Sequence, residues 1–219
     1  MSKRSGTAIK ATKKPVIVLA GEDGNDRHCL RIVLEAGHPD ARGRLVEINE
    51  QVRLRQASPQ NLADRVDKLV RLAEARAARE RAPIGAFFVH EDFDAIDSPD
   101  RAQVRDRVQG ALTRRMPNAC YVLATWEVEA WLLLFPQAVA ATCSSWQVPK
   151  KYLGRDTAKV HDPKQVMARE VSRGGPRYRE SDATRIFAKA AELQELSSPA
   201  GTNVSWQELG AHITSLPPL

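Results

Sequence analysis

The chain has 219 residues, of which 42% are hydrophobic and 27% are charged, as is ordinary for a globular protein. A chain of this length can bury a core without disulfides or structural metals, and no apolar run approaches the ~20 residues that a membrane helix needs. The sequence therefore argues against a membrane protein, while the net charge of +6 permits binding to nucleic-acid phosphates without requiring it.

The chain starts with a basic segment, residues 1–14 (MSKRSGTAIKATKK), which is small, polar and without periodicity. This composition predicts a disordered, solvated arm, with a nucleic-acid contact as the alternative. No apolar signal segment follows the basic residues, so we expect a cytoplasmic protein. Three cysteines, Cys29, Cys120 and Cys143, lack metal-ligand spacing and are typical of reduced thiols in a core.

Apolar runs predict four buried strands, at residues 15–20, 44–49, 84–90 and 119–125. Apolar positions at helical spacing predict three helices between them, one ending at Gly37 and the others over 58–81 and 99–116. Strands that alternate with helices imply right-handed crossovers and a sheet covered on both faces. The predicted fold class is α/β, with a mostly parallel four-stranded sheet flanked by helices.

The pattern beyond Thr125 is helical, and we expect helices over 127–135, 162–171, 181–196 and 205–214, the last with Ser205 as its N-cap. We therefore divide the chain into an α/β core, residues 15–135, and a mostly helical C-terminal extension, residues 136–219, packed on that core.

Acidic residues follow two of the predicted strands. Glu22 comes just after the first strand, and Asp92 and Asp94 come just after the third. Since parallel strands end at the same sheet edge, we expect these carboxylates to meet there and to hold Mg²⁺ or Mn²⁺. For the Asp-x-Asp pair alone, the simpler explanation is that the aspartates cap a helix or form a turn.

This arrangement resembles the Toprim fold, in which a glutamate follows the first strand and an Asp-x-Asp pair follows the third. The segment 22–26 (EDGND) is similar to the first Toprim motif, with Asp23 where glycine is usual and Asn25 where threonine is usual. The resemblance implies a Toprim-like core and a Mg²⁺-dependent nuclease. In such an enzyme Glu22, Asp92 and Asp94 would be the catalytic and metal-binding residues.

A second resemblance is to RloB-like proteins and related uncharacterised bacterial proteins. It is carried by residues 126–132 (WEVEAWL), 149–152 (PKKY) and 162–164 (DPK), together with Tyr178. Several members of that group accompany ATPase partners in bacterial anti-phage, or abortive-infection, modules. The resemblance therefore implies a defence effector that works with an ATPase partner.

Further candidate residues follow the fourth strand. Glu127 and Glu129 could be additional metal ligands, although carboxylates at a helix N-terminus are favourable for electrostatic reasons alone. Lys150, Lys151 and Lys164 stand in loops near prolines and are candidates for binding nucleic acid. His90 could titrate near neutral pH, or it could be simply buried and hydrogen-bonded.

The sequence leaves three functions open. The first is a Mg²⁺- or Mn²⁺-dependent Toprim-type nuclease acting on DNA or RNA. The alternative is a catalytically decayed Toprim scaffold that serves as a binding or regulatory subunit of an ATPase complex. A sugar-nucleotide transferase that uses Asp-x-Asp comes last, because no sugar-binding feature is evident.

Overall fold

The computed structural model describes residues 13–219, so nearly all of the predicted basic arm lies outside the described residues. A sheet of four strands lies at the centre: β1 (Val16–Gly21), β2 (Leu45–Gln51), β3 (Ile84–Asp92) and β4 (Ala119–Ala124). Their spatial order is β2-β1-β3-β4, and every neighbouring pair is parallel. The prediction of an α/β protein with a four-stranded parallel sheet is confirmed.

Strand β1 shows why the sheet forms from continuous apolar runs. All six of its residues are buried, because helices cover both faces. Its side chains alternate, so that Ile17 and Leu19 enter the core on one face while Val16 and Val18 enter the core on the other. A parallel sheet buried in this way has no hydrophilic face, and its polar residues collect at the strand ends.

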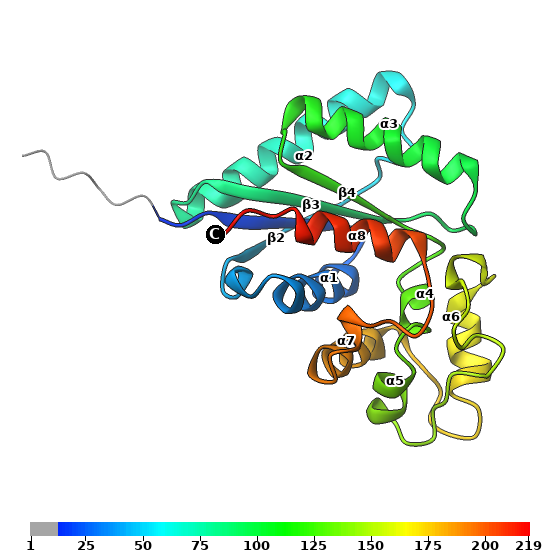
Figure 1. Cartoon of the computed structure of the whole chain (residues 1–219). Helices are drawn as coiled ribbons and strands as arrows, with labels where there is room; N and C mark the ends of the chain where they lie inside the picture. Colours follow the sequence, from blue (N-terminus) through cyan, green and yellow to red (C-terminus); the bar gives the residue numbers. More distant parts are fainter. Residues whose placement is uncertain (1–12) are drawn as a thin grey trace, which may run out of the picture.

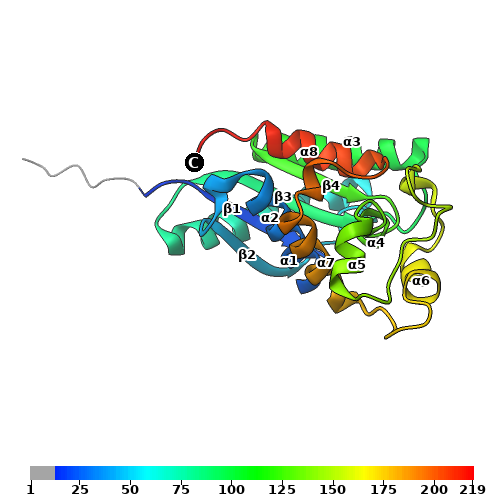
Figure 2. The same ribbon diagram turned by 60° about the horizontal axis from the view of Figure 1, so that its bottom comes forward.

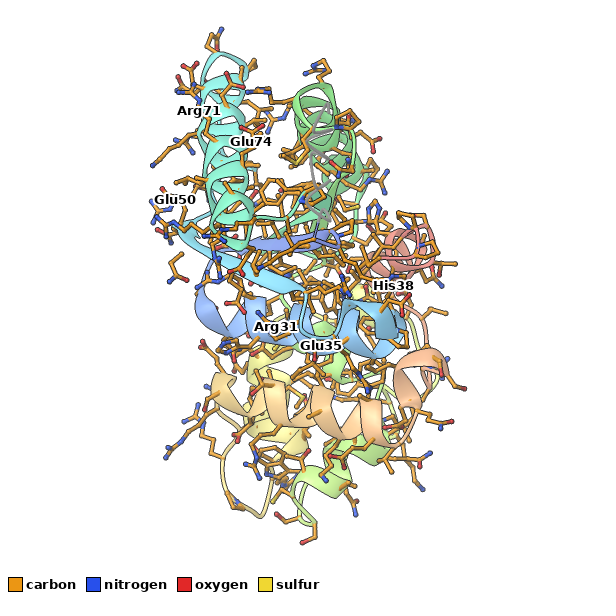
Figure 3. The ribbon with its side chains drawn as sticks, turned by 90° about the vertical axis from the view of Figure 1, so that its left-hand side faces the viewer. Arg31, Glu35, His38, Glu50, Arg71 and Glu74 are labelled. Carbon is orange, nitrogen blue, oxygen red and sulfur yellow. The ribbon has the colours of Figure 1, made fainter. Side chains whose placement is uncertain are left out.

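Helices α2 (Pro59–Glu80) and α3 (Pro99–Arg115) cover one face of the sheet, and α1 (Gly24–Gly37) and α8 (Val204–Thr214) cover the other (Figure 1). The outer surfaces of these layers are charged. Figure 3 shows Arg71 and Glu74 on α2, above the sheet, and Arg31 and Glu35 on α1, below it. Arg71 and Glu74 face solvent, whereas α1 is partly covered by α7, and the carboxyl edge of the sheet is the place where polar groups meet.

After β4 the structure confirms helical segments close to the predicted 162–171, 181–196 and 205–214, but it breaks the helix predicted over 127–135. In place of one helix over 127–135 there are two short ones, α4 (Glu129–Leu132) and α5 (Pro136–Thr142). Pro136 explains the break, because proline disfavours a helical conformation in the residue before it, and Phe135 has φ −122° and ψ 63°. The chain continues through α6 (Pro163–Val166), the π-helical turn Met167–Val171 and α7 (Ala183–Glu192).

The segments after residue 135 share one apolar core with the sheet. Four aromatic rings join them: the ring centroids of Phe135 and Trp206 are 5.1 Å apart, those of Phe135 and Phe187 are 6.0 Å apart, and those of Trp131 and Trp206 are 5.7 Å apart. Figure 2 shows α5 and α7 beside α1, with α6 at the outer margin. None of the helices within residues 13–219 is both long and apolar enough to cross a membrane.

Candidate functional site

The carboxyl ends of β1 and β3 bring Glu22 and Asp92 together. The two strands are neighbours in the sheet, and Glu22 directly follows the last residue of β1. Strand β3 is longer than predicted and ends at Asp92, because Glu91 and Asp92 still pair with β4. The Asp92 backbone N–H donates to Oε1 of Glu22 at 3.1 Å.

A small pocket of about 70 Å³ opens at this edge. Six carboxylates of the described residues line it, from the loop between β1 and α1, from α1, β3 and α4, and from the turn before α7: Glu22, Asp23, Asp26, Asp92, Glu129 and Glu180. Among residues 13–219, Lys164 of α6 is the one cationic side chain in its lining. We call this site the acidic pocket.

Asp26 is a member of the acidic pocket that the sequence did not single out. It lies in the first turn of α1, where Asp23 is the N-cap and accepts the backbone N–H of Asp26 at 3.0 Å. The buried imidazole of His90 stands between two acids, with Nδ1 3.7 Å from Asp26 Oδ2 and Nε2 3.8 Å from Asp92 Oδ1. Neither nitrogen has a hydrogen-bond partner among the described residues, so His90 is buried as expected but not directly hydrogen-bonded.

Burial and mutual repulsion disfavour the charged state of several of these acids. Burial, followed by the charges of Asp26 and Glu22, holds the pKa of Asp92 well above its usual range. Burial also raises the pKa of Glu22, and burial with the charge of Glu127 raises the pKa of Glu129 to about 7. The protein groups around Asp92, Glu22 and Glu129 therefore do not fully stabilise the negative charges of these carboxylates.

Glu127 and Glu129 lie at different depths. Glu129 is buried, and its carboxylate accepts a hydrogen bond of 2.9 Å from the Tyr178 hydroxyl. Glu127 turns toward the extension, where Oε1 accepts the backbone N–H of Lys164 at 2.9 Å and Oε2 lies 3.0 Å from Lys164 Nζ. Glu129 is thus the better placed of the two for a ligand in the acidic pocket.

The three candidate lysines have separate environments. Lys164 lines the acidic pocket, and its ammonium also pairs with Glu180 at 3.3 Å. Although burial acts to lower it, the pKa of Lys164 is raised by Glu127 and other neighbouring carboxylates. Lys151 pairs with Glu170 at 2.7 Å and Lys150 is exposed, and neither of them lines the pocket.

Asp94 lies outside the acidic pocket. Its side chain is 64% exposed, and Oδ2 pairs with Arg55 Nη2 at 2.5 Å. The backbone turns at this residue, with φ at +58°, and the Asp94 N–H donates to the Trp126 carbonyl. The structure therefore brings Glu22 and Asp92 together as metal-ligand candidates and directs Asp94 toward Arg55.

The donors of the acidic pocket fit a hard divalent cation, which prefers carboxylate oxygens. Asp92 Oδ1 is buried and has no hydrogen-bond partner among the described residues, so it is free to bind such a cation. Within residues 13–219, however, no three His, Cys, Asp or Glu side chains are already gathered closely enough to hold one ion. Ligation by Glu22, Asp92 and a third carboxylate would require side-chain rotation into the pocket.

No protein-family model, curated protein or solved structure matches this chain. Any function therefore has to be inferred from the acidic pocket and from the short motifs in the sequence.

Proposed function

We propose that this protein is a Mg²⁺- or Mn²⁺-dependent Toprim-type nuclease that cleaves DNA or RNA. The observation that carries the proposal is the contact between Glu22, which follows β1, and Asp92, which ends the neighbouring parallel strand β3, at one pocket. The raised pKa values of both carboxyls support it, because a cation would offset the cost of their burial and, for Asp92, the repulsion from Asp26 and Glu22. The parallel sheet of four strands is compatible with a Toprim-like core.

In this proposal Glu22 and Asp92 hold the cation, with Asp26 or Glu129 as a further ligand. A bound Mg²⁺ would polarise the scissile phosphate as a Lewis acid and would stabilise charge on the leaving oxygen. Glu22 is also the candidate general acid or base, since burial raises its pKa and a catalytic acid or base works best when its pKa is near the working pH. His90 lies between Asp26 and Asp92, 3.7 and 3.8 Å from their carboxylate oxygens.

The alternative proposal is a catalytically decayed Toprim scaffold that acts as a regulatory subunit of an ATPase complex. One observation favours it: Lys164 lines the acidic pocket and provides a built-in positive charge there. Calorimetric titration with Mg²⁺ separates the two proposals, because a decayed site would bind no cation. Co-purification with the product of a neighbouring ATPase gene would test the proposed role in anti-phage defence.

The nuclease proposal is tested with end-labelled single-stranded DNA, duplex DNA and RNA, each incubated in Mg²⁺, Mn²⁺ or EDTA. We expect cleavage that depends on the metal and falls at least 100-fold in Asp92→Asn and Glu22→Gln, since each loses a charged ligand. Asp100→Asn is the matched control, because Asp100 is exposed in the first turn of α3 and does not line the acidic pocket. Cleavage that persists in both pocket variants would contradict the proposal.

A further inference from the structure

A second, larger cavity adjoins the acidic pocket. This groove, of about 820 Å³, lies between α5, the α6 region and the segment that leads into α7. Four cationic side chains line it, Lys164, Arg177, Arg179 and Arg185, against two acids, Glu180 and Asp182. We call it the basic groove. Its charge is opposite to that of the acidic pocket beside it.

The two central arginines of the basic groove are available for a ligand. Arg177 and Arg179 are exposed, and neither guanidinium makes an ion pair or a hydrogen bond with any described residue. Arg185, in contrast, pairs with Asp182 at 3.0 Å. Arg177 and Arg179 therefore carry charge that nothing in the described chain neutralises.

Buried aromatic residues hold these arginines in place. Tyr178, between them in sequence, is only 4% exposed and donates its hydroxyl to Glu129 of the acidic pocket. Trp146 is 2% exposed, and its Nε1–H donates to the carbonyl of Pro176 at 2.7 Å. Since the segment is pinned at residues 176 and 178, Arg177 and Arg179 are presented to solvent from a fixed backbone.

The basic groove and the acidic pocket are neighbours that share two lining residues. Lys164 and Glu180 line both, and their side chains pair at 3.3 Å at the junction. The Asn25 side chain donates to the Glu180 carbonyl at 3.2 Å and so ties the junction to the start of α1. A chain of phosphates in the basic groove would therefore lead directly to the carboxylates of Glu22 and Asp92.

We infer that the basic groove binds the phosphodiester backbone of a nucleic-acid strand and delivers it to the acidic pocket, an inference that rests on the proposed nuclease function. Arginine recognises phosphate oxygens by paired hydrogen bonds. The two aromatic rings that line the groove, Trp146 and Tyr178, are buried and serve as anchors, so the described part of the chain offers no exposed ring there for stacking with a base. Recognition in the groove is thus of the backbone and independent of base sequence.

Binding is measured by fluorescence anisotropy in EDTA, in an Asp92→Asn background that prevents cleavage. The probes are labelled single-stranded DNA, single-stranded RNA and duplex DNA of equal length and two unrelated sequences. The test variant is Arg177→Gln with Arg179→Gln. The matched control is Arg79→Gln with Arg114→Gln, which removes equal charge from exposed positions on α2 and α3, across the sheet.

We expect the groove variant to weaken binding at least 10-fold at ~0.1 M salt, equally for both sequences, with the control unchanged. For single strands, the slope of the logarithm of the binding constant against the logarithm of the salt concentration should become shallower by roughly 1.4. This is about 0.7 for each of the two lost phosphate contacts. The three probes decide whether the strand is DNA or RNA and whether it enters single or paired. Equal losses in the groove and control variants would overturn the inference, as would full competition by inorganic phosphate, which would indicate a small-anion site.

Different experimental results would contradict the groove assignment and the proposed nuclease function. If the parent chain cleaves nucleic acid and the groove variant cleaves it with unchanged KM, the groove assignment is wrong and the nuclease stands. If the groove variant loses binding but the parent chain cleaves nothing in Mg²⁺ or Mn²⁺, the groove assignment holds and the nuclease is wrong.

Discussion

The carboxylate of Glu22 accepts the backbone N–H of Asp92, although 70 positions separate the two residues in the chain. The donor is a main-chain group, fixed by the pairing of β3 with β4. Glu22 is therefore held by the sheet itself and not by the Asp92 side chain. Replacing the Asp92 carboxylate by an amide leaves this hydrogen bond in place. The substitution therefore removes charge from the acidic pocket without changing the position of Glu22.

The first prediction concerns how the Asp92 charge and bound Mg²⁺ change the thermal stability of the protein. In EDTA, Asp92→Asn should raise the melting temperature, because burial and neighbouring acids disfavour the native carboxylate. Mg²⁺ at 100 times its Kd should stabilise the parent chain by roughly 2.7 kcal/mol and leave Asp92→Asn nearly unchanged. Thermal unfolding with and without Mg²⁺ measures both effects.

Asp94→Asn is the comparison for that experiment. Because the Asp94 carboxylate is exposed and pairs with Arg55, its neutral variant should retain most of the Mg²⁺ stabilisation. A Mg²⁺ effect lost in Asp94→Asn but kept in Asp92→Asn would show that the ligands lie outside the acidic pocket.

The second prediction is a pH dependence that arises from Glu129. Burial, with the charge of Glu127, raises its folded-state pKa from 4.5 to about 7. Between these values the native state keeps a proton that the unfolded chain has released, so stability falls as the pH rises. The stability of the parent chain relative to Glu129→Gln should therefore fall by roughly 3 kcal/mol between pH 4.5 and 7.5.

Urea unfolding in EDTA across this pH range measures that difference, and taking it against Glu129→Gln cancels the other titrating groups. A difference that does not change with pH would mean that Glu129 titrates normally in the native state.

The sequence was sufficient to predict the sheet and the meeting of Glu22 with Asp92. Apolar runs mark buried strands, and parallel strands necessarily end at one edge. Asp26 was missed because its side chain enters the acidic pocket only through the way α1 packs on the sheet. Tyr178 and Glu180 join the site from the far end of the chain, and no local pattern encodes that contact.

Asp94 shows that the spacing of residues in the sequence is not enough to predict which carboxylates lie together. Alternate residues of a strand point to the same face, so an Asp-x-Asp pair suggests two ligands side by side. The strand ends at Asp92, and the positive φ of Asp94 turns the second acid away. Likewise Ser205 was predicted to cap the last helix, but Asn203 is the N-cap, because its buried amide reaches two backbone N–H groups of α8.

The third prediction concerns the buried carboxylate of Glu91, which points to the opposite face of the sheet from Asp92. Its Oε2 accepts the Tyr121 hydroxyl at 2.8 Å, and both side chains are buried. Tyr121→Phe should destabilise the protein by about 1–3 kcal/mol, because it leaves a buried acceptor short of a donor. Urea unfolding measures the loss.

Tyr152→Phe provides the matched control, since the Tyr152 hydroxyl donates to Glu170 at 3.1 Å in a partly exposed pair. It should cost less than about 1 kcal/mol, because water replaces the lost donor. Equal costs for the two variants would indicate that water reaches Glu91.

The fourth prediction concerns the attachment of α8 to the carboxyl edge. Asn203 is fully buried, and its Oδ1 accepts the backbone N–H groups of Ser205 and Trp206 at 3.0 and 3.2 Å, while Nδ2 donates to Thr157 at 3.0 Å. Asn203→Ala removes the helix cap and leaves buried partners unsatisfied, so it should cost about 2–4 kcal/mol. Ser58→Ala, which removes the exposed cap of α2, should cost about 1 kcal/mol.

Hydrogen exchange distinguishes a local from a global effect of this change. The Ser205 hydroxyl oxygen accepts the Thr125 backbone N–H at 3.1 Å and the Trp131 indole N–H at 2.8 Å, which ties α8 to the end of β4 and to α4. In Asn203→Ala the amides of α8 and Thr125 should therefore exchange faster than those of β1, because the anchor loosens before the sheet does. If Asn203→Ala costs no more than Ser58→Ala and exchange at Thr125 is unchanged, the buried network does not hold α8 against the sheet.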